Sequence, residues 1–195
     1  MHLTYADVFR PTAKKSALAY DAMLVLAGSV LLALGAQVAF YLPGTPVPIT
    51  GQTLAVLLAG ALFGPVRGPA AVVTYLLQGA AGLPVFAAGN AGVAYIIGPT
   101  GGYLLAFVPA AWVVGLLSRR GWDRRALSLA PAMLLGSLVI YAGGMLWLTC
   151  YVGTAHALAM GVGPFIIGDL LKIAASALLL PVGWKILRQI GPACR

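Results

Sequence analysis

Residues 164–187 read PFIIGDLLKIAASALLLPVGWKIL, and this stretch decides which class of fold the chain can adopt. Its apolar side chains run far enough to cross a hydrocarbon core of about 30 Å as a helix. Near its start stand two charged residues, Asp169 and Lys172, whose i and i+3 spacing places both on one face of that helix. One ionised side chain at a bilayer centre costs roughly 2.5 to 3.5 kcal/mol on insertion scales. The pair therefore marks the first candidate for a functional site.

The chain as a whole has the composition of an integral membrane protein. Hydrophobic residues make up 61% of the 195 residues, charged residues make up 8%, and the mean hydropathy is +0.97. So little polar surface cannot cover a soluble globule. The formal net charge of +8 is spread over short segments without stacking aromatic residues, which favours orientation in a membrane and argues against nucleic-acid binding. The first twenty residues lack the pattern of a signal peptide, so we expect the first span to stay in the mature protein.

Apolar runs separated by turn residues predict an all-α membrane protein with six transmembrane helices. The six segments are residues 21–41, 52–64, 68–82, 101–118, 126–150 and 164–187. We expect one membrane domain over residues 1–195, with a cytoplasmic amino-terminal segment at 1–20 and a membrane core at 21–190.

Basic residues set the expected orientation of these segments. Eleven of the twelve Lys and Arg residues then fall on one side of the membrane. They are Arg10, Lys14, Lys15, Arg67, Arg119, Arg120, Arg124, Arg125, Lys185, Arg188 and Arg195. By the positive-inside rule this side is cytoplasmic, which places both termini in the cytoplasm and the protein in the cell membrane.

The second and third segments are short for membrane spans. About fourteen residues give about 21 Å of helix, less than the hydrocarbon core. Both meet uncharged loops rich in Gly and Pro on the outer side, at residues 41–50 and 83–102. Irregular backbone at membrane depth is tolerated where protein buries it or where it lines a cavity. We therefore expect an outward-facing binding pocket capped by the first loop; the alternative is a pair of surface loops in contact with lipid headgroups.

Asp169 and Lys172 together offer an anionic acceptor and a cationic donor in an apolar wall. Such a site suits a small ligand that carries N–H donors and a carbonyl or carboxylate acceptor. The alternative is a salt bridge that neutralises itself and pins a loop. Asn90 and Gln52 each supply a donor and an acceptor and each have two interpretations, as a ligand contact or as a local cap. Thr50 and Tyr95 complete the candidate set, although Tyr95 also fits an aromatic belt at the membrane surface.

Four motifs in order resemble one known family. They are Pro46-Val-Pro-Ile-Thr-Gly-Gln-Thr-Leu54, Ala81-Gly-Leu-Pro-Val-Phe86, Gly98-Pro-Thr-Gly-Gly-Tyr103 and Gly168-Asp-Leu-Leu-Lys172. Together they are similar to the BioY family, the biotin-specific S components of energy-coupling-factor transporters. The resemblance implies six transmembrane helices, capture of biotin from outside, and a lid formed by the first outer loop. It also implies that Asn90, Asp169 and Lys172 contact the ligand, with Asp169 accepting from a ureido N–H and Lys172 donating to either the ureido or the carboxylate oxygen.

The resemblance further implies partners. A transmembrane coupling protein and a pair of ATPase subunits would supply the energy, because no G-x-x-x-x-G-K-[ST] motif occurs in this chain. We expect no cofactor and no metal. An intramembrane enzyme is disfavoured, since the chain has no glutamate and no H-E-x-x-H motif. A channel is disfavoured by the uniformly apolar inner halves of the segments, and an S component for another vitamin stays open as the alternative.

Overall fold

The structure is a computed structural model that describes residues 2–190; Cys194 and Arg195 lie outside the described residues. Its α-helices are α1 (Tyr5–Val8), α2 (Lys14–Gln37), α3 (Gln52–Ala80), α4 (Val93–Ile96), α5 (Gly101–Ser118), α6 (Ala126–Val152), α7 (Thr154–Gly161) and α8 (Ile166–Ile190). Three short 3-10 helices are η1 (Ala87–Gly89), η2 (Trp122–Arg124) and η3 (Gly163–Phe165). A two-stranded hairpin pairs β1 (Ala39–Phe40) with β2 (Ile49–Thr50). The predicted all-α membrane class is confirmed.

Five stretches within residues 2–190 are long and apolar enough to cross a membrane. They are α2, α3, α5, α6 and residues 154–187, which join α7 to α8. The predicted segments 52–64 and 68–82 are two arms of the single element α3. The expected count of six spans treats these arms separately, and it stays a prediction.

The bend in α3 lies at Gly64, where φ is 83° and ψ is −173°. A positive φ is easily adopted only by glycine, and Pro65 has no N–H to continue the hydrogen-bond ladder. A Cβ at Gly68 would lie 2.9 Å from the carbonyl oxygen of Ala59, so glycine is also needed where the two arms approach. The bend therefore turns one element into two short arms that pack against each other near Gly64.

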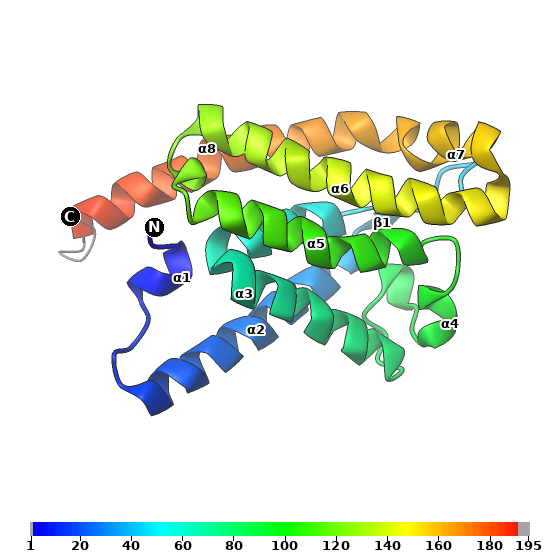
Figure 1. Cartoon of the computed structure of the whole chain (residues 1–195). Helices are drawn as coiled ribbons and strands as arrows, with labels where there is room; N and C mark the ends of the chain where they lie inside the picture. The colour runs from blue at the N-terminus through cyan, green and yellow to red at the C-terminus, as the bar shows by residue number, and fades with distance from the viewer. Residues whose placement is uncertain (1, 191–195) are drawn as a thin grey trace.

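The helices pack in the order α2, α3, α5, α6 and α8, with contacts between each neighbouring pair. Figure 1 shows α1, the loop between α5 and α6, and the end of α8 at one end of the bundle. The elements α4, α7 and β1 lie at the other end (Figure 1). Most of the basic residues belong to segments at the first end.

The two ends of α2 and one additional helix are the main differences from the sequence prediction. Helix α2 begins at Lys14 and not at residue 21, because the charged start of the helix projects beyond the apolar run. It ends at Gln37, four residues early, because the chain turns into the β1–β2 hairpin. Helix α7 was not predicted; it follows Gly153, whose φ of 77° breaks the helical path after α6.

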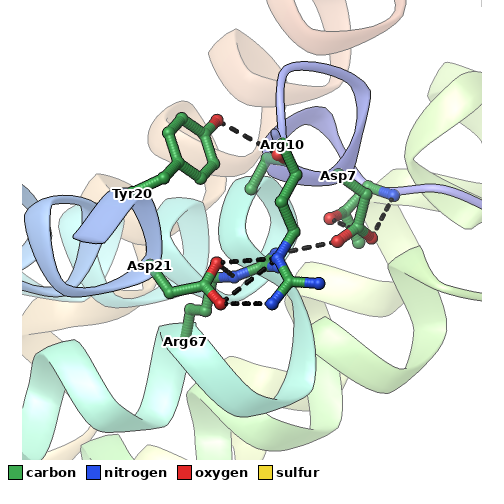
Figure 2. Close-up of polar contacts among 7 residues, drawn as sticks. Asp7, Arg10, Tyr20, Asp21 and Arg67 are labelled. Atoms are coloured by element: carbon green, nitrogen blue, oxygen red, sulfur yellow. Dashed lines mark hydrogen bonds and ion pairs between the residues drawn. The ribbon is translucent and has the colours of Figure 1, made fainter. Parts of the chain in front are cut away.

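Ion pairs tie α1 and α2 to the bend of α3, as Figure 2 shows. The Arg67 guanidinium lies 2.8 Å from Asp7 Oδ1 and 2.7 Å from Asp21 Oδ1, and Arg10 lies 2.7 Å from Asp21 Oδ2. The Tyr20 hydroxyl donates to the carbonyl oxygen of Ala6. Burial alone would raise the pKa of Asp7, but hydrogen bonds from Arg67 and from Thr4 hold that pKa below its usual range. This cluster fixes the amino-terminal segment at the end of the bundle away from α4 and α7.

Candidate ligand-binding site

One apolar pocket lies where the β1–β2 hairpin, α3, α5, α6 and α8 meet. Its free volume is about 40 Å³, small beside the roughly 300 to 1,000 Å³ of pockets that hold drug-sized ligands. Its lining residues are Val47, Pro48, Thr50, Gln52, Thr53, Tyr95, Thr100, Tyr103, Leu104, Phe107, Ile140, Tyr141, Phe165 and Lys172. Four of the six candidates from the sequence, Thr50, Gln52, Tyr95 and Lys172, therefore share one cavity.

Lys172 is held by three oxygen atoms at the wall of this pocket. Its Nζ atom donates to the Thr50 carbonyl oxygen at 2.8 Å, to Thr53 Oγ1 at 2.8 Å and to Asp169 Oδ1 at 2.8 Å. A lysine ammonium has three N–H donors, so every donor has a partner within the protein. The cation is also largely shielded, with 20% of its side chain exposed.

Asp169 is the anionic half of the pair and is more deeply buried. Its Oδ1 atom accepts from Lys172 and from Thr53 Oγ1, the latter at 2.9 Å. Its Oδ2 atom accepts from the Tyr141 hydroxyl at 2.6 Å. A carboxylate has about four lone-pair sites, so one acceptor position is left on Oδ2, beside Tyr141. Among the described residues, the site is net neutral and can accept one further hydrogen bond without losing any.

Gln52 is buried at the start of α3 and has a structural role in this pocket. Its Oε1 atom accepts from Thr50 Oγ1 at 3.2 Å, and its Nε2 atom donates to the Tyr75 hydroxyl. Thr50 Oγ1 also accepts from the backbone N–H of Gln52 at 3.3 Å. These bonds hold β2 against the first turn of α3, which aims the Thr50 carbonyl at Lys172.

Asn90 does not line the pocket, which differs from the sequence prediction. The residue is exposed, and its side-chain Nδ2 atom donates to the Ala87 carbonyl oxygen at 2.7 Å. The backbone carbonyl oxygen of Asn90 accepts from the Phe86 N–H at 3.0 Å. Asn90 therefore caps a turn in this structure, the alternative that the sequence left open, because the short amide side chain bonds its own loop. The Phe86 ring stacks on Tyr95 with centroids 5.2 Å apart, so the turn supports a pocket residue.

Two pocket residues that matter for Asp169 were missed by the sequence analysis. Thr53 stands next to Gln52 at the start of a predicted segment, which was a usable signal. Tyr141 stands in the middle of an otherwise apolar segment, and a lone hydroxyl at that depth needs a partner. Only the packing of α6 against α8 shows that this partner is Asp169.

Aromatic side chains form the apolar part of the wall. Tyr103 and Phe165 lie with ring centroids 6.4 Å apart, and the Tyr103 hydroxyl donates to the Gly161 carbonyl oxygen at 2.8 Å. Phe107 and Tyr95 line the same pocket. Flat rings of this kind suit a fused or saturated ring system that carries few charges.

The first outer loop covers the pocket, as the sequence predicted. Val47 is 5% exposed and, with Pro48, lines the cavity. Thr45 Oγ1 donates to the Met160 carbonyl oxygen of α7 at 2.8 Å, which ties the loop to the far wall. The pocket is therefore capped from one side by a hairpin whose ends are paired, Ala39 with Thr50 and Phe40 with Ile49.

The arrangement can bind and orient a small polar head group through an acid–base pair, hydroxyls and aromatic rings. No group of three His, Cys, Asp or Glu side chains is placed to hold a metal ion in the part of the chain that the structure describes.

Comparisons with known proteins found a matching family and relatives that cover most of the chain. The model of the BioY family matches residues 10–189. A protein of Pyrococcus horikoshii named "Probable biotin transporter BioY" is 40% identical over 161 residues, which are 83% of this chain and 94% of the relative. A protein of Thermotoga maritima named "Biotin transporter BioY" is 40% identical over 159 residues, covering 80% of this chain and 92% of the relative.

A solved structure has the same fold. It is described as the crystal structure of the S-component for biotin from an ECF-type ABC transporter. It superposes with a TM-score of 0.79, covers 90% of this chain and 95% of its own, and is 23% identical in sequence.

Proposed function

This chain belongs to the BioY family, and from that premise we propose that it is a membrane-embedded subunit that binds biotin with high affinity and mediates its uptake. The single observation that carries the proposal is the Asp169–Lys172 pair: Lys172 lines a capped, aromatic pocket, and Asp169 lies behind it, bonded to the lining residues Thr53 and Tyr141. Biotin has a ureido ring with two N–H donors and a carbonyl, an apolar sulfur-containing ring, and a carboxylate on a short chain. The pocket offers a matching acceptor, donor and apolar wall. The protein binds and passes on its ligand and is not an enzyme.

The ureido group is the part of biotin that meets the charged pair. Asp169 has one acceptor position left on Oδ2, and a ureido N–H fills it without displacing Tyr141. The ureido oxygen and the nitrogen of that N–H are bonded to the same carbon atom. The edge of the ring that meets Asp169 therefore also presents the ureido oxygen to Lys172 Nζ. The carboxylate lies at the other end of the molecule. We therefore assign the ureido oxygen to Lys172, a choice that the sequence left open.

The ligand must displace a protein oxygen to reach Lys172. All three donors of the ammonium are used in this structure, by Thr50, Thr53 and Asp169. Loss of the Asp169 contact would separate buried opposite charges, so the exchange takes place at Thr50 or Thr53. The pocket widens at the same time, since about 40 Å³ does not hold biotin. Binding and movement of the hairpin are thereby coupled.

The other candidate residues take supporting roles. Gln52 and Thr50 hold β2 on α3, and Tyr95 provides a flat wall for the sulfur-containing ring. Asn90 acts through the turn that sets Phe86 against Tyr95.

The family and the charge pattern support a proposal for the location and the partners. The protein is a multi-pass membrane protein, and we propose that the basic end of the bundle, which includes α1 and the end of α8, faces the cytoplasm and that both termini are cytoplasmic. A separate transmembrane coupling protein and ATPase subunits supply the energy, because this chain has no phosphate-binding nucleotide motif of its own.

Isothermal titration of the detergent-purified chain with biotin tests the proposal. We expect one site, a dissociation constant in the nanomolar range, and biotin recovered unchanged. A second arm measures uptake of labelled biotin in cells with and without the coupling subunits, which separates binding from energy supply. Saturation by another vitamin, with no heat from biotin, would favour the alternative substrate.

A further inference from the structure

A second pocket lies at the opposite end of the bundle, where α6 begins. It is lined by His2, Gly121, Arg124, Arg125 and Ser128 and has a volume of about 430 Å³. Gly121 has a φ of 86°, and a Cβ there would lie 2.8 Å from the His2 ring, so the turn and the histidine fit only because the residue is glycine. We refer to this feature as the basic pocket.

The cations of the basic pocket have no carboxylate partner within residues 2–190. Neither Arg124 nor Arg125 forms an ion pair with a described residue. Arg124 senses Asp123 electrostatically, but Asp123 is fully buried and accepts a hydrogen bond from Trp184 Nε1 at 2.6 Å. The chain contains four acidic residues. Besides Asp123, Asp7 and Asp21 belong to the cluster of Figure 2, and Asp169 pairs with Lys172 at the ligand pocket.

Two further observations indicate that an acceptor is missing from the basic pocket. The Nε atom of Arg124 is buried and has no hydrogen-bond partner among the described residues. A buried donor without an acceptor costs about 1 to 3 kcal/mol, more when it is charged. The pocket also lies at the amino terminus of α6, whose N-cap residue Arg125 makes no side-chain cap bond. The positive end of this helix therefore adds to the attraction for an anion.

The surroundings of the basic pocket favour a ligand that is anionic at one end and apolar at the other. Leu127, two residues after Arg125, is 92% exposed, and Leu3 is 46% exposed. A leucine so exposed at the start of a membrane helix has lipid chains as its natural neighbours. The guanidinium fork of arginine binds phosphate oxygens in pairs.

We propose that the basic pocket binds the phosphate group of an anionic phospholipid, with Arg124 and Arg125 as its main ligands. The lipid supplies a phosphate acceptor beside Arg124, whose Nη2 atom donates to the Leu3 carbonyl oxygen at 3.4 Å, while the Arg124 head group stays stacked over Trp184, 4.5 Å from the ring centroid. The acyl chains lie along the start of α6 beside Leu127. This site is separate from the ligand pocket and does not depend on the proposed function.

Native mass spectrometry of the full chain, released from nanodiscs that contain phosphatidylglycerol and phosphatidylcholine, tests the proposal. The variant is Arg124→Gln with Arg125→Gln. The matched control is Lys14→Gln with Lys15→Gln, which removes the same charge from exposed residues at the start of α2. The arginine variant loses the charge-assisted hydrogen bonds to one phosphate, whereas the lysine control loses only general surface charge, so we expect at least about fivefold less retained phosphatidylglycerol in the arginine variant. The control and the wild-type chain should retain equal amounts.

The single variant Arg125→Gln tests whether misfolding explains the result of the double variant. Arg125 is exposed and unpaired among the described residues, so its loss should not disturb the fold. It should lower retention while leaving the thermal midpoint and biotin binding unchanged. Equal retention by all variants, equal loss in the lysine control, or no preference over phosphatidylcholine would each overturn the proposal. Millimolar inorganic phosphate forms a further arm: if it displaces the lipid and raises the thermal midpoint by itself, the site binds soluble phosphate and the lipid assignment is wrong.

Discussion

Lys172 Nζ lies 2.8 Å from the carbonyl oxygen of Thr50, and this contact joins α8 to β2, the second strand of the hairpin that caps the pocket. The two residues are 122 positions apart in the sequence. Because the same ammonium also bonds Asp169 and Thr53, a ligand oxygen that reaches Lys172 acts on the hairpin directly. Occupancy of the site and position of the cap are linked through one nitrogen atom.

Removing either charge of the pair should weaken biotin binding. Asp169→Asn and Lys172→Ala each strand a buried charged partner, so we expect losses of at least about 1 to 3 kcal/mol in binding free energy by calorimetry. Asp21→Asn is the control, since it removes an acid that pairs with Arg10 and Arg67 in the cluster of Figure 2. Unchanged titration curves for both pocket variants would remove the pair from the site.

Tyr141→Phe should weaken biotin binding less than loss of the charge does. The hydroxyl holds Asp169 Oδ2, and its removal frees the carboxylate to rotate away from the ligand. A lost hydrogen bond to a charged group predicts about 1.5 to 3 kcal/mol at most, and we expect a threefold to tenfold rise in the dissociation constant, about 1 kcal/mol. The matched control is Tyr151→Phe, whose hydroxyl donates to the Ile97 carbonyl outside the pocket. Equal effects of the two variants would contradict a role for Tyr141 at Asp169.

Asn90→Ala distinguishes a turn cap from a direct ligand contact. If Asn90 acts only through Phe86 and Tyr95, the dissociation constant for biotin should rise by no more than about threefold, within the usual range for a lost cap. The variant should also lower the thermal midpoint of the unliganded protein. A loss of affinity as large as that of Asp169→Asn, with an unchanged midpoint, would mean that Asn90 touches the ligand.

Thr45→Val should speed the release of biotin. The substitution keeps the shape of the side chain and removes the bond from Thr45 Oγ1 to the Met160 carbonyl, which ties the cap to α7. The substitution also removes the acceptor of the Val47 N–H, which lies 3.2 Å from Thr45 Oγ1. Loss of the hydrogen bond to α7, worth about 1 kcal/mol, predicts an off-rate at least about fivefold higher, measured by displacement of labelled biotin. Thr149→Val is the control, because its hydroxyl bonds Leu146 within its own helix. A slow, unchanged off-rate would show that the cap does not limit release.

Asp123 should make stability depend on pH. Burial raises the pKa of Asp123 from 3.8 to about 6, against the hydrogen bond from Trp184 and the charge of Arg124. A raised pKa in the folded state means that the fold binds the proton more tightly than the unfolded chain does. This contribution is present below about pH 4 and is lost as the pH rises through 6, by about 3 kcal/mol at most.

Asp123→Asn removes this titration and keeps an oxygen for Trp184 Nε1. The difference in thermal midpoint between the wild-type chain and the variant should therefore change between pH 4 and pH 7, in favour of the variant at the higher pH. The Tyr5 hydroxyl donates to the Leu180 carbonyl oxygen. Because burial and the charge of Asp123 raise the pKa of Tyr5 above its usual range, Tyr5 does not titrate in this window. Parallel midpoint curves would show that Asp123 is not buried as a charge.

Particular residues show how far the sequence could predict the site. Asp169 and Lys172 were found because a charge in an apolar helix is costly wherever that helix packs, and Thr50 and Gln52 lay in a recognisable motif. Asn90 was assigned to the ligand because an amide fits either a ligand or a turn, and spacing does not distinguish the two. Tyr141 and Thr53 were missed since their importance depends on Asp169, which is 28 and 116 positions away.

The sequence by itself determined that this protein is a helical membrane protein with its basic residues gathered toward one end, because hydrophobic run length and charge are local properties that a bilayer selects directly. Only the tertiary structure decided where the pocket lies and that α3 doubles back at Gly64. It also decided that Lys172 Nζ donates all three of its hydrogen bonds, to Thr50, Thr53 and Asp169. These features depend on which helices touch and at which heights. Hydrogen-bond partners far apart in the chain meet only after the helices have packed, so no periodicity in the sequence encodes them.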